Sequence, residues 1–218
     1  MPLGPRIRAV LGPLEVPIGR LYRGYFVDLA QLAEEIRIGG PADAVLEVGC
    51  GEGSLTEEIA RCFPQSAITG IDITPRIGRL YRGHPARTAF RQASVQQIAE
   101  SAPAAYDVVV LADVLHHVTP EERAPLLQGI RRVLRPGGRF VLKEWERIPG
   151  IPHALAWLSD RFLTGDRVQF LRAAQLRELV ESVFGRGCIE KEIRIRPRRN
   201  NLALFVRDRV LKSCDAPR

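Results

Sequence analysis

The chain has 218 residues with a net charge of +7, and 45% of its residues are hydrophobic. This length suits a single domain (1–218), and without a run of about 18 apolar residues or a secretory leader we expect a cytoplasmic protein with no membrane span. None of its four cysteines forms a C-x-x-C pair, so we expect neither a zinc knuckle nor a disulfide framework.

The basic charge gathers in two stretches, residues 76–91 and 194–199. Such a surface attracts nucleic acid, an anionic membrane or an acidic carrier protein, and a merely solvated basic surface is an alternative of equal weight. Basic and aromatic residues do not alternate in these stretches, so we expect no nucleic-acid partner.

The first 20 residues are rich in proline and glycine and predict an irregular arm. From residue 21 onward the apolar residues Tyr25, Leu29, Leu32 and Ile36 are spaced to line one face of a helix. A Gly-Gly-Pro sequence then ends this helix.

The stretch VLEVGCGEGSLT at residues 45–56 predicts a buried strand, a glycine turn and the start of a helix. Glycine is needed where the backbone adopts positive φ or approaches a ligand, and the helix N-terminus presents free N–H groups to that ligand. The spacing G-x-G-x-G is one residue shorter than the dinucleotide fingerprint, and no P-loop lysine follows. Glu47 needs a cation or a hydrogen-bond donor, because burying a lone carboxylate is costly. An ordinary tight turn is the alternative interpretation.

With E-x-G-x-G-x-G in one strand and turn, this stretch resembles the first motif of class I S-adenosylmethionine (SAM) methyltransferases. The resemblance implies a Rossmann-like fold that binds SAM as cofactor at this turn. It places Glu47 near the methionine ammonium group of SAM. The backbone of Gly49, Cys50, Gly51 and Gly53 would pass under the methionyl and ribose groups.

In this family, N-terminal helices often cap the substrate pocket, so the resemblance makes residues 1–40 an arm and a cap helix. Tyr22, Tyr25 and Phe26 would then wall the substrate. The alternative is that these rings only pack the helix onto the sheet.

A second predicted strand, residues 67–71, ends in Asp72, about 20 residues beyond the glycines, where a carboxylate can accept hydrogen bonds from both hydroxyls of a ribose. An NAD enzyme would use the same acid, and in the methyltransferase resemblance Ile73 lies against the adenine. After a weak third strand at residues 88–92, the family commonly has an acid that binds the adenine amino group. Here Ser94 and Val95 stand in that loop, and Ser94 or a backbone carbonyl would accept the hydrogen bond.

The stretch YDVVVLADVLHHV at residues 106–118 predicts a fully buried strand that includes Leu111, followed by Asp113, His116 and His117. It resembles the fourth strand of the family, which implies that Leu111 adjoins the cofactor. Because ligands of open α/β sheets bind at the carboxyl ends of the strands, the acid and the two histidines are candidate catalytic residues. Either histidine would serve as a general base, or the three residues would hold a divalent cation, as in some methyltransferases that act on quinone precursors. The third alternative is that one histidine only packs and that proximity alone drives transfer.

A helix at residues 121–134 and the phrase LRPGGRFVL lead into a fifth strand that ends at residue 145, and the resemblance is continuous up to this point. The next crossover, residues 148–187, is longer than needed. Insertions here commonly cover the substrate in this fold, which makes Trp157 and Phe162 pocket candidates. The last two strands, residues 189–195 and 201–206, are joined by too short a link for a crossover and must run antiparallel.

We therefore expect an α/β, Rossmann-like class I methyltransferase fold, a mostly parallel seven-stranded sheet with an antiparallel terminal hairpin and helices on both faces. The resemblance implies a SAM-dependent methyltransferase of secondary metabolism, monomeric or homodimeric, with no metal assigned. It would methylate a hydroxyl or an activated carbon of a small molecule, either free or on an acidic carrier protein. The alternatives are a catalytically inactive SAM-binding regulatory protein, a metal-assisted catechol-type O-methyltransferase and an NAD-dependent reductase.

Overall fold

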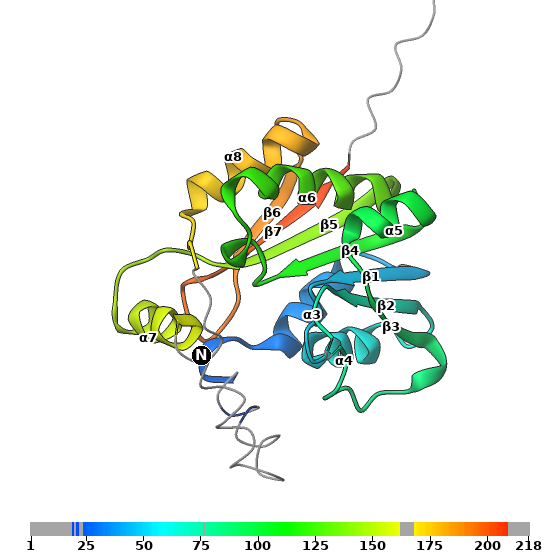
Figure 1. The fold of residues 1–218 in the computed structure, drawn as a ribbon, viewed down its shortest axis with the longest axis horizontal. Helices are drawn as coiled ribbons and strands as arrows, with labels where there is room; N and C mark the ends of the chain where they lie inside the picture. Colours follow the sequence, from blue (N-terminus) through cyan, green and yellow to red (C-terminus); the bar gives the residue numbers. More distant parts are fainter. Residues whose placement is uncertain (1–18, 20, 22–23, 76, 162–167, 209–218) are drawn as a thin grey trace, which may run out of the picture.

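The computed structural model describes residues 19, 21, 24–75, 77–161 and 168–208, which form a seven-stranded sheet in the order β3-β2-β1-β4-β5-β7-β6 (Figure 1). Strands β1 to β5 pair in parallel, and β7 runs antiparallel to both of its neighbours, β5 and β6. The predicted fold class and the terminal hairpin are confirmed. The strands are β1 (Ala44–Val48), β2 (Ala67–Asp72), β3 (Thr88–Gln92), β4 (Tyr106–Ala112), β5 (Leu134–Trp145), β6 (Ile189–Arg194) and β7 (Asn201–Arg207).

Helices cover both faces of the sheet. Figure 1 shows α5, α6 and α8 on one face and α3 and α4 on the other, in agreement with two separate cores of buried apolar side chains. None of the described helices combines the length and the apolarity that crossing a bilayer requires. The helices are α3 (Leu29–Ile38), α4 (Ser54–Cys62), α5 (Val95–Ser101), α6 (Pro120–Val133), α7 (Ile151–Ser159) and α8 (Ala173–Phe184), with short 3₁₀ turns η2 (Pro85–Arg87) and η3 (Leu115–His117).

The prediction of one continuous helix from residue 21 to residue 36 is wrong. Val27 forms an isolated bridge with Pro197, and Asp28 is the N-cap of α3, where its carboxylate accepts a hydrogen bond from the N–H of Gln31 at 2.9 Å. An aspartate is well suited to this place, because its side chain satisfies a free N–H group at the helix start. The helical pattern therefore breaks where the chain meets the β6–β7 link.

The N-terminal helix packs onto the sheet. Leu32, Ala33 and Ile36 of α3 are fully buried in the core shared with α4. A cap over the substrate therefore remains a prediction only for the segment before Val27, which carries Tyr25 and Phe26. Residues 1–18 and Tyr22 lie outside the described residues.

The long crossover after β5 divides into two parts with different surroundings. Helix α8 packs beside α6 and buries Leu176, Val180 and Phe184 in the core, so it is an ordinary crossover helix. Helix α7 lies apart from both helix layers, beyond the carboxyl ends of the strands (Figure 1). Only the part of the crossover that precedes α8 therefore remains a candidate for the predicted substrate cover.

Candidate functional site

The glycine turn after β1 has the backbone that its sequence predicts. Gly49, Gly51 and Gly53 all have positive φ, at 73°, 49° and 88°. A Cβ atom at Gly49 would overlap with the side chain of Val114, whereas one at Gly51 would meet nothing within 4 Å. Glycine is needed at position 49 for close packing against the loop after β4, and at position 51 the turn faces open space that a ligand can occupy.

Asp72, at the end of β2, lies directly beside this open space. Its Oδ2 accepts a hydrogen bond from the N–H of Gly51 at 2.8 Å, and its Oδ1 accepts from the N–H and Oγ1 of Thr74 at 2.9 Å each. The next residue, Ile73, is 74% exposed. A carboxylate with lone pairs to spare beside an exposed apolar side chain suits a ribose and a base.

Glu47 is a buried acid beneath the glycine turn. Its Oε2 accepts a hydrogen bond from Oγ1 of Thr56 at 2.5 Å. The pKa of Glu47 is raised to about 8. Desolvation is the main cause, the hydrogen bond from Thr56 opposes it, and the negative charge of Asp72 adds to it. Burial also raises the pKa of the neighbouring Cys50 thiol, so that thiol is no nucleophile. A bound cation beside Glu47 would favour its ionised form.

Ser94, Val95 and Leu111 were also predicted to contact the cofactor, and they differ in which of their atoms can reach it. Ser94 is the N-cap of α5, where its Oγ accepts from the N–H of Gln97 at 3.3 Å, which leaves one lone pair. The side chains of Val95 and Leu111 are buried in the core, so only backbone atoms of these residues can reach a ligand.

Asp113 and Lys143 form an ion pair at the carboxyl ends of β4 and β5. Asp113 has a φ of 55°, which is unusual for a residue other than glycine. The ammonium group of Lys143 donates to its two carboxylate oxygens at 2.7 and 2.5 Å, and the N–H of Asp113 donates to the carbonyl of Lys143 at 2.9 Å. The lysine side chain is 1% exposed, while that of Asp113 is 36% exposed and faces the open edge.

Glu144, the next residue on β5, holds the loop that carries the histidines. Its Oε1 accepts from the N–H groups of Val114 and Leu115 at 2.8 and 2.7 Å, and its Oε2 lies 2.8 Å from Nδ1 of His116. Burial lowers the pKa of His116, but Glu144, with smaller contributions from Asp113 and Asp160, outweighs it, so the pKa is raised. His116 is therefore fixed by Glu144 and closed off from solvent.

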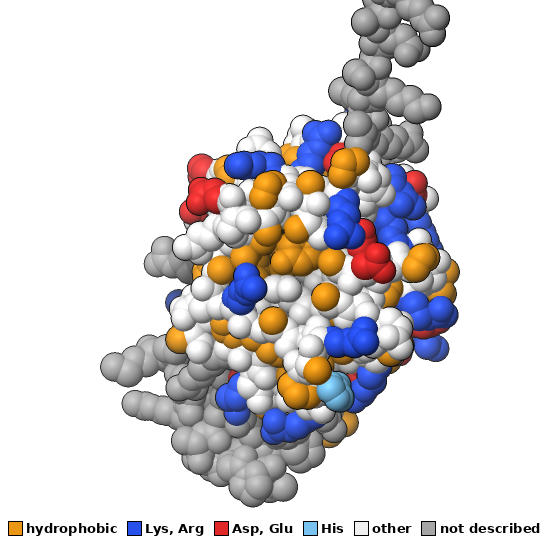
Figure 2. All heavy atoms as spheres, turned by 90° about the vertical axis from the view of Figure 1, so that its right-hand side faces the viewer, with side chains coloured by type: hydrophobic (Ala, Val, Ile, Leu, Met, Phe, Trp, Pro, Cys, Tyr) orange, Lys and Arg blue, Asp and Glu red, His pale blue; other side chains and the backbone are white. Residues whose placement is uncertain are grey.

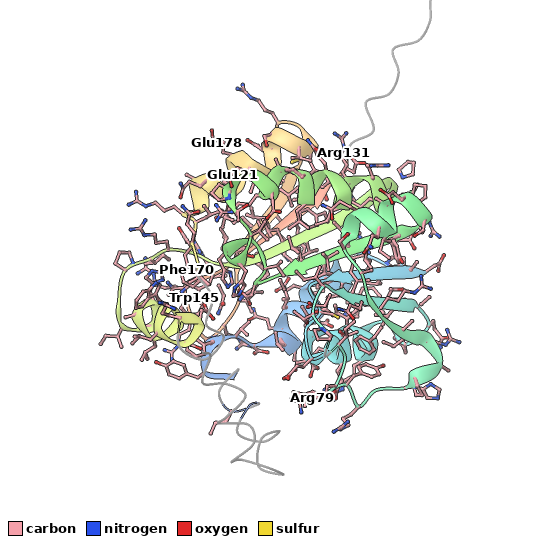
Figure 3. The ribbon with its side chains drawn as sticks, in the orientation of Figure 1. Arg79, Glu121, Arg131, Trp145, Phe170 and Glu178 are labelled. Carbon is pink, nitrogen blue, oxygen red and sulfur yellow. The ribbon has the colours of Figure 1, made fainter. Side chains whose placement is uncertain are left out.

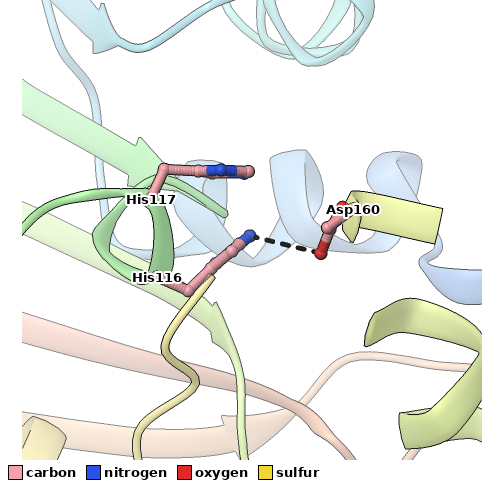
Figure 4. A group of neighbouring side chains, drawn as sticks. All are labelled: His116, His117 and Asp160. Atoms are coloured by element: carbon pink, nitrogen blue, oxygen red, sulfur yellow. Dashed lines mark ion pairs between the residues drawn. The ribbon is translucent and has the colours of Figure 1, made fainter. Parts of the chain in front are cut away.

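His117 is the exposed member of the pair. Its ring centroid lies 4.2 Å from that of His116. Figure 4 shows both rings pointing toward Asp160, which follows α7, and Oδ2 of Asp160 is 3.9 Å from Nε2 of His116. The edge thus presents one accessible imidazole next to one that is held in place.

Two groups of described side chains bring three potential metal ligands within 4.8 Å of one another. In the group of Asp113, His116 and Glu144, the Lys143 ammonium already binds Asp113, and Glu144 is already paired with His116. The cation site that the resemblance implied, on Asp113 and both histidines, therefore does not fit, because its acid is occupied. The second group consists of His116, His117 and Asp160.

Aromatic side chains wall this edge on the side of α7. Trp145 and Phe170 lie close together in Figure 3, and Phe170 stacks on His116 with ring centroids 4.8 Å apart. Phe26 packs edge-on against Trp145 at 5.6 Å, and Tyr25 against Phe26 at 5.0 Å. The Nε1 of Trp145 donates to Nδ1 of His153 at 3.3 Å.

The structure thus brings the predicted residues Asp113, His116 and His117 to one edge, and Tyr25 and Phe26 to its aromatic wall. Trp157 lies on α7 and is partly exposed, and Phe162 lies outside the described residues. Lys143, Glu144, Asp160 and Phe170 were not predicted as site residues. Two adjacent charges at the end of a buried strand were the signal that could have indicated Lys143 and Glu144.

Residues 45–138 match the family described as a methyltransferase domain. The chain is 33% identical over 131 residues to a ubiquinone biosynthesis O-methyltransferase of Xanthomonas campestris pv. campestris, covering 58% of this chain and 53% of that protein. It is 34% identical over 123 residues to the protein of the same name from Xanthomonas euvesicatoria pv. vesicatoria, covering 55% and 49%. The chain spans about half the length of these curated relatives.

Solved structures of methyltransferases share the fold. The 1,6-didemethyltoxoflavin-N1-methyltransferase of Burkholderia thailandensis, bound to 1,6-didemethyltoxoflavin and S-adenosylhomocysteine, aligns with a TM-score of 0.65 and 22% identity over 95% of this chain and 91% of that one. Human N-acetylserotonin methyltransferase in complex with SAM aligns with a TM-score of 0.62 and 18% identity over 84% and 51%. At these identities the likeness supports the fold alone.

Proposed function

We propose that this chain, whose residues 45–138 match a methyltransferase domain, is a class I SAM-dependent enzyme that transfers a methyl group from SAM to a hydroxyl group of a small molecule with an apolar body. The observation that carries the proposal is the close packing of Gly49 against Val114. This contact brings the glycine turn, with Glu47 beneath it and Asp72 beside it, next to the loop of the two histidines. A cofactor bound on one side would therefore adjoin an acceptor on the other.

The residues around the glycine turn fit SAM, which supplies a methyl group on a positively charged sulfonium. Glu47 would receive the ammonium group of the cofactor, since a cation there offsets the cost of ionising a buried acid. Asp72 would accept the ribose hydroxyls, and Ile73 would lie against the adenine. Ser94 and the backbone of Val95 and Leu111 would complete the base site.

We assign the proton transfer to His117, because it is the exposed imidazole, whereas Glu144 and Phe170 enclose His116. A neutral imidazole can take the hydroxyl proton near neutral pH. Asp113 keeps one face open to the acceptor while Lys143 neutralises its charge. Phe26, Tyr25 and Trp157, which keep exposed surface, would hold the apolar body of the acceptor, and the buried rings of Trp145 and Phe170 would support them from behind.

The test combines calorimetry of SAM binding with mass-spectrometric detection of methylated products from a panel of phenols and other hydroxy compounds. We expect His117→Gln to lower kcat by about 100-fold or more with unchanged SAM affinity, since general bases contribute on that scale. The matched control is His84→Gln, because His84 is exposed and caps η2, far along the chain from this edge.

Each outcome has a defined meaning. Failure to bind SAM would refute the methyltransferase assignment, and SAM binding without transfer to any acceptor would favour a regulatory protein instead. A fully active His117→Gln variant would refute the base and leave positioning as the source of catalysis.

We propose that the acceptor is a free small molecule and is not bound to a carrier protein, in keeping with the expected role in cytoplasmic secondary metabolism. The arginines that would contact a carrier protein are Arg196, Arg198 and Arg199, and two of them are engaged by the chain itself: Arg196 lies 3.7 Å from Asp28, and Arg198 stacks on Tyr25 at 3.9 Å. Figure 2 draws the face of the molecule that points away from α7, and there the basic side chains lie among apolar and acidic ones. These contacts support the free acceptor over the carrier-bound one.

A further inference from the structure

Helix α7 exposes an apolar face to solvent. Its sequence, IPHALAWLS, contains no charged residue. Ile151, Leu155 and Leu158 are 77%, 40% and 42% exposed, and Trp157 is 45% exposed. Positions separated by four and by seven residues lie on one side of a helix, so the three aliphatic side chains form a single stripe. A helix of a soluble protein normally carries polar residues on this side.

The opposite side of α7 attaches the helix to the proposed acceptor site. Ala156 is buried against Trp145 and Phe170, and His153 accepts the hydrogen bond from the indole of Trp145. Asp160, the residue that follows the helix, faces His116. The exposed stripe is therefore separated from the histidines by little more than the thickness of one helix.

Around α7, the basic side chains are exposed and the acidic side chains point toward the protein. Arg147 and Arg161, which precede and follow the helix, are exposed, and so is Arg199 on the β6–β7 link. Burial, and after it the charge of Arg147, lowers the pKa of His153 on α7. The acids at the two ends point inward, because Glu146 binds Arg194 and the N–H of Ala173, and Asp160 faces His116.

We propose that the stripe of Ile151, Leu155 and Leu158 docks on the surface of an anionic lipid bilayer, with Arg147 and Arg161 at the level of the headgroups. Apolar side chains that enter the interface and basic residues that meet anionic lipid are the two parts of such binding. A symmetric contact between two copies of the chain fits less well, because it would bring together two helices that are both flanked by arginine. Docking would place the aromatic wall next to the bilayer, from which an acceptor with an apolar body can enter.

The test measures co-sedimentation of the full chain with vesicles of phosphatidylcholine alone and of phosphatidylcholine mixed with phosphatidylglycerol, without SAM or acceptor. We expect binding to the mixed vesicles that weakens as salt is added. Ile151→Ser should reduce the partition coefficient about tenfold, and the triple serine variant at positions 151, 155 and 158 should abolish binding. The matched control is Ile38→Ser, the same substitution at a 59% exposed position at the end of α3, which should bind as the unaltered chain does.

A charge variant and a lipid-free measurement complete the test. The double variant Arg147→Glu, Arg161→Glu should weaken binding to the vesicles that contain phosphatidylglycerol and should not change the interaction with vesicles of phosphatidylcholine alone. Equal binding of the Ile151→Ser and Ile38→Ser variants, or no binding of the unaltered chain to anionic vesicles, would overturn the proposal. So would a lipid-free dimer that dissociates in the triple serine variant, because a second copy would then cover the stripe. The measurement involves no methyl transfer, so it stands or falls separately from the proposed function.

Discussion

Replacement of Glu144 tests whether this residue holds the histidine loop in place. Its carboxylate accepts two backbone N–H groups and faces Nδ1 of His116, all within 2.8 Å and out of contact with solvent. Glu144→Ala leaves three polar groups without their partner, and we expect it to lower the free energy of unfolding by about 3 to 5 kcal/mol. Glu144→Gln keeps an oxygen for the N–H groups and loses only the charge, so its cost should be about 1 to 2 kcal/mol.

The charge of Glu144 also predicts how stability depends on pH. Glu144 raises the pKa of His116 in the folded protein above its ordinary value of about 6.5. The stabilisation from the protonated imidazole is therefore fully present below pH 6.5 and is lost as the pH rises through the folded pKa. The difference in unfolding free energy between the unaltered chain and Glu144→Gln should be larger at pH 6 than well above the folded pKa.

Urea unfolding followed by circular dichroism measures both effects, and NMR of the ring nitrogens reports the tautomer of His116. Glu34→Ala is the control, because Glu34 only forms an exposed ion pair with Arg37, so its removal should leave unfolding unchanged. If Glu144→Ala unfolds at the same urea concentration as the unaltered chain, Glu144 does not hold the loop. If the difference in unfolding free energy between the unaltered chain and Glu144→Gln is the same at pH 6 as it is well above the folded pKa, the raised pKa of His116 is refuted.

Four further predictions concern the two halves of the site. Asp72→Asn should weaken SAM binding by about 1 to 3 kcal/mol in calorimetry, because the charge-assisted hydrogen bonds to the ribose are lost, and unchanged affinity in a folded variant would refute this role. The pKa of Glu47 is raised to about 8, so the folded cofactor-free protein binds the extra proton and its stability should fall between about pH 4.5 and 8; Glu47→Gln should remove this fall in thermal unfolding. Gly49→Ala should destabilise the fold by overlap with Val114, whereas Gly51→Ala, also at positive φ but facing open space, should lose SAM affinity more than stability. Because Lys143 already binds Asp113, a chelator should leave turnover unchanged, and a loss that added cation restores would instead indicate a metal on His116, His117 and Asp160.

The residues that were predicted correctly belong to local patterns. The glycine turn follows directly from its spacing, because positive φ after a buried strand selects glycine at each position. The strand pattern placed Asp72 at the end of β2, where it lies, while its role toward a ribose stays a prediction; the antiparallel pairing of β7 followed from the shortness of its link to β6. Such inferences need only a few neighbouring residues.

The mistaken helix from residue 21 shows where local pattern fails. Its apolar spacing is helical throughout, yet the helix is interrupted between Phe26 and Leu29, because Val27 pairs with Pro197 and the N–H of Asp28 donates to the carbonyl of Arg196 at 2.7 Å. These partners are about 170 residues away in the chain, and no pattern around residue 27 indicates them. The same applies to α3, whose amphipathic face could have covered either a substrate or the sheet.

By itself, the sequence determined the succession of the seven strands, the glycine turn and the presence of an acid and two histidines after β4, because each depends on side chains adjacent in the chain. It left the two histidines equivalent. Only the tertiary structure distinguished them, since Glu144 on the neighbouring strand binds His116 and leaves His117 exposed. The tertiary structure also decided that Asp113 meets an ammonium group. Parallel pairing sets Ala112 beside Lys143, and the lysine side chain then lies against Asp113, the residue after Ala112. Partners on different strands are chosen by register, and register is a property of the folded sheet.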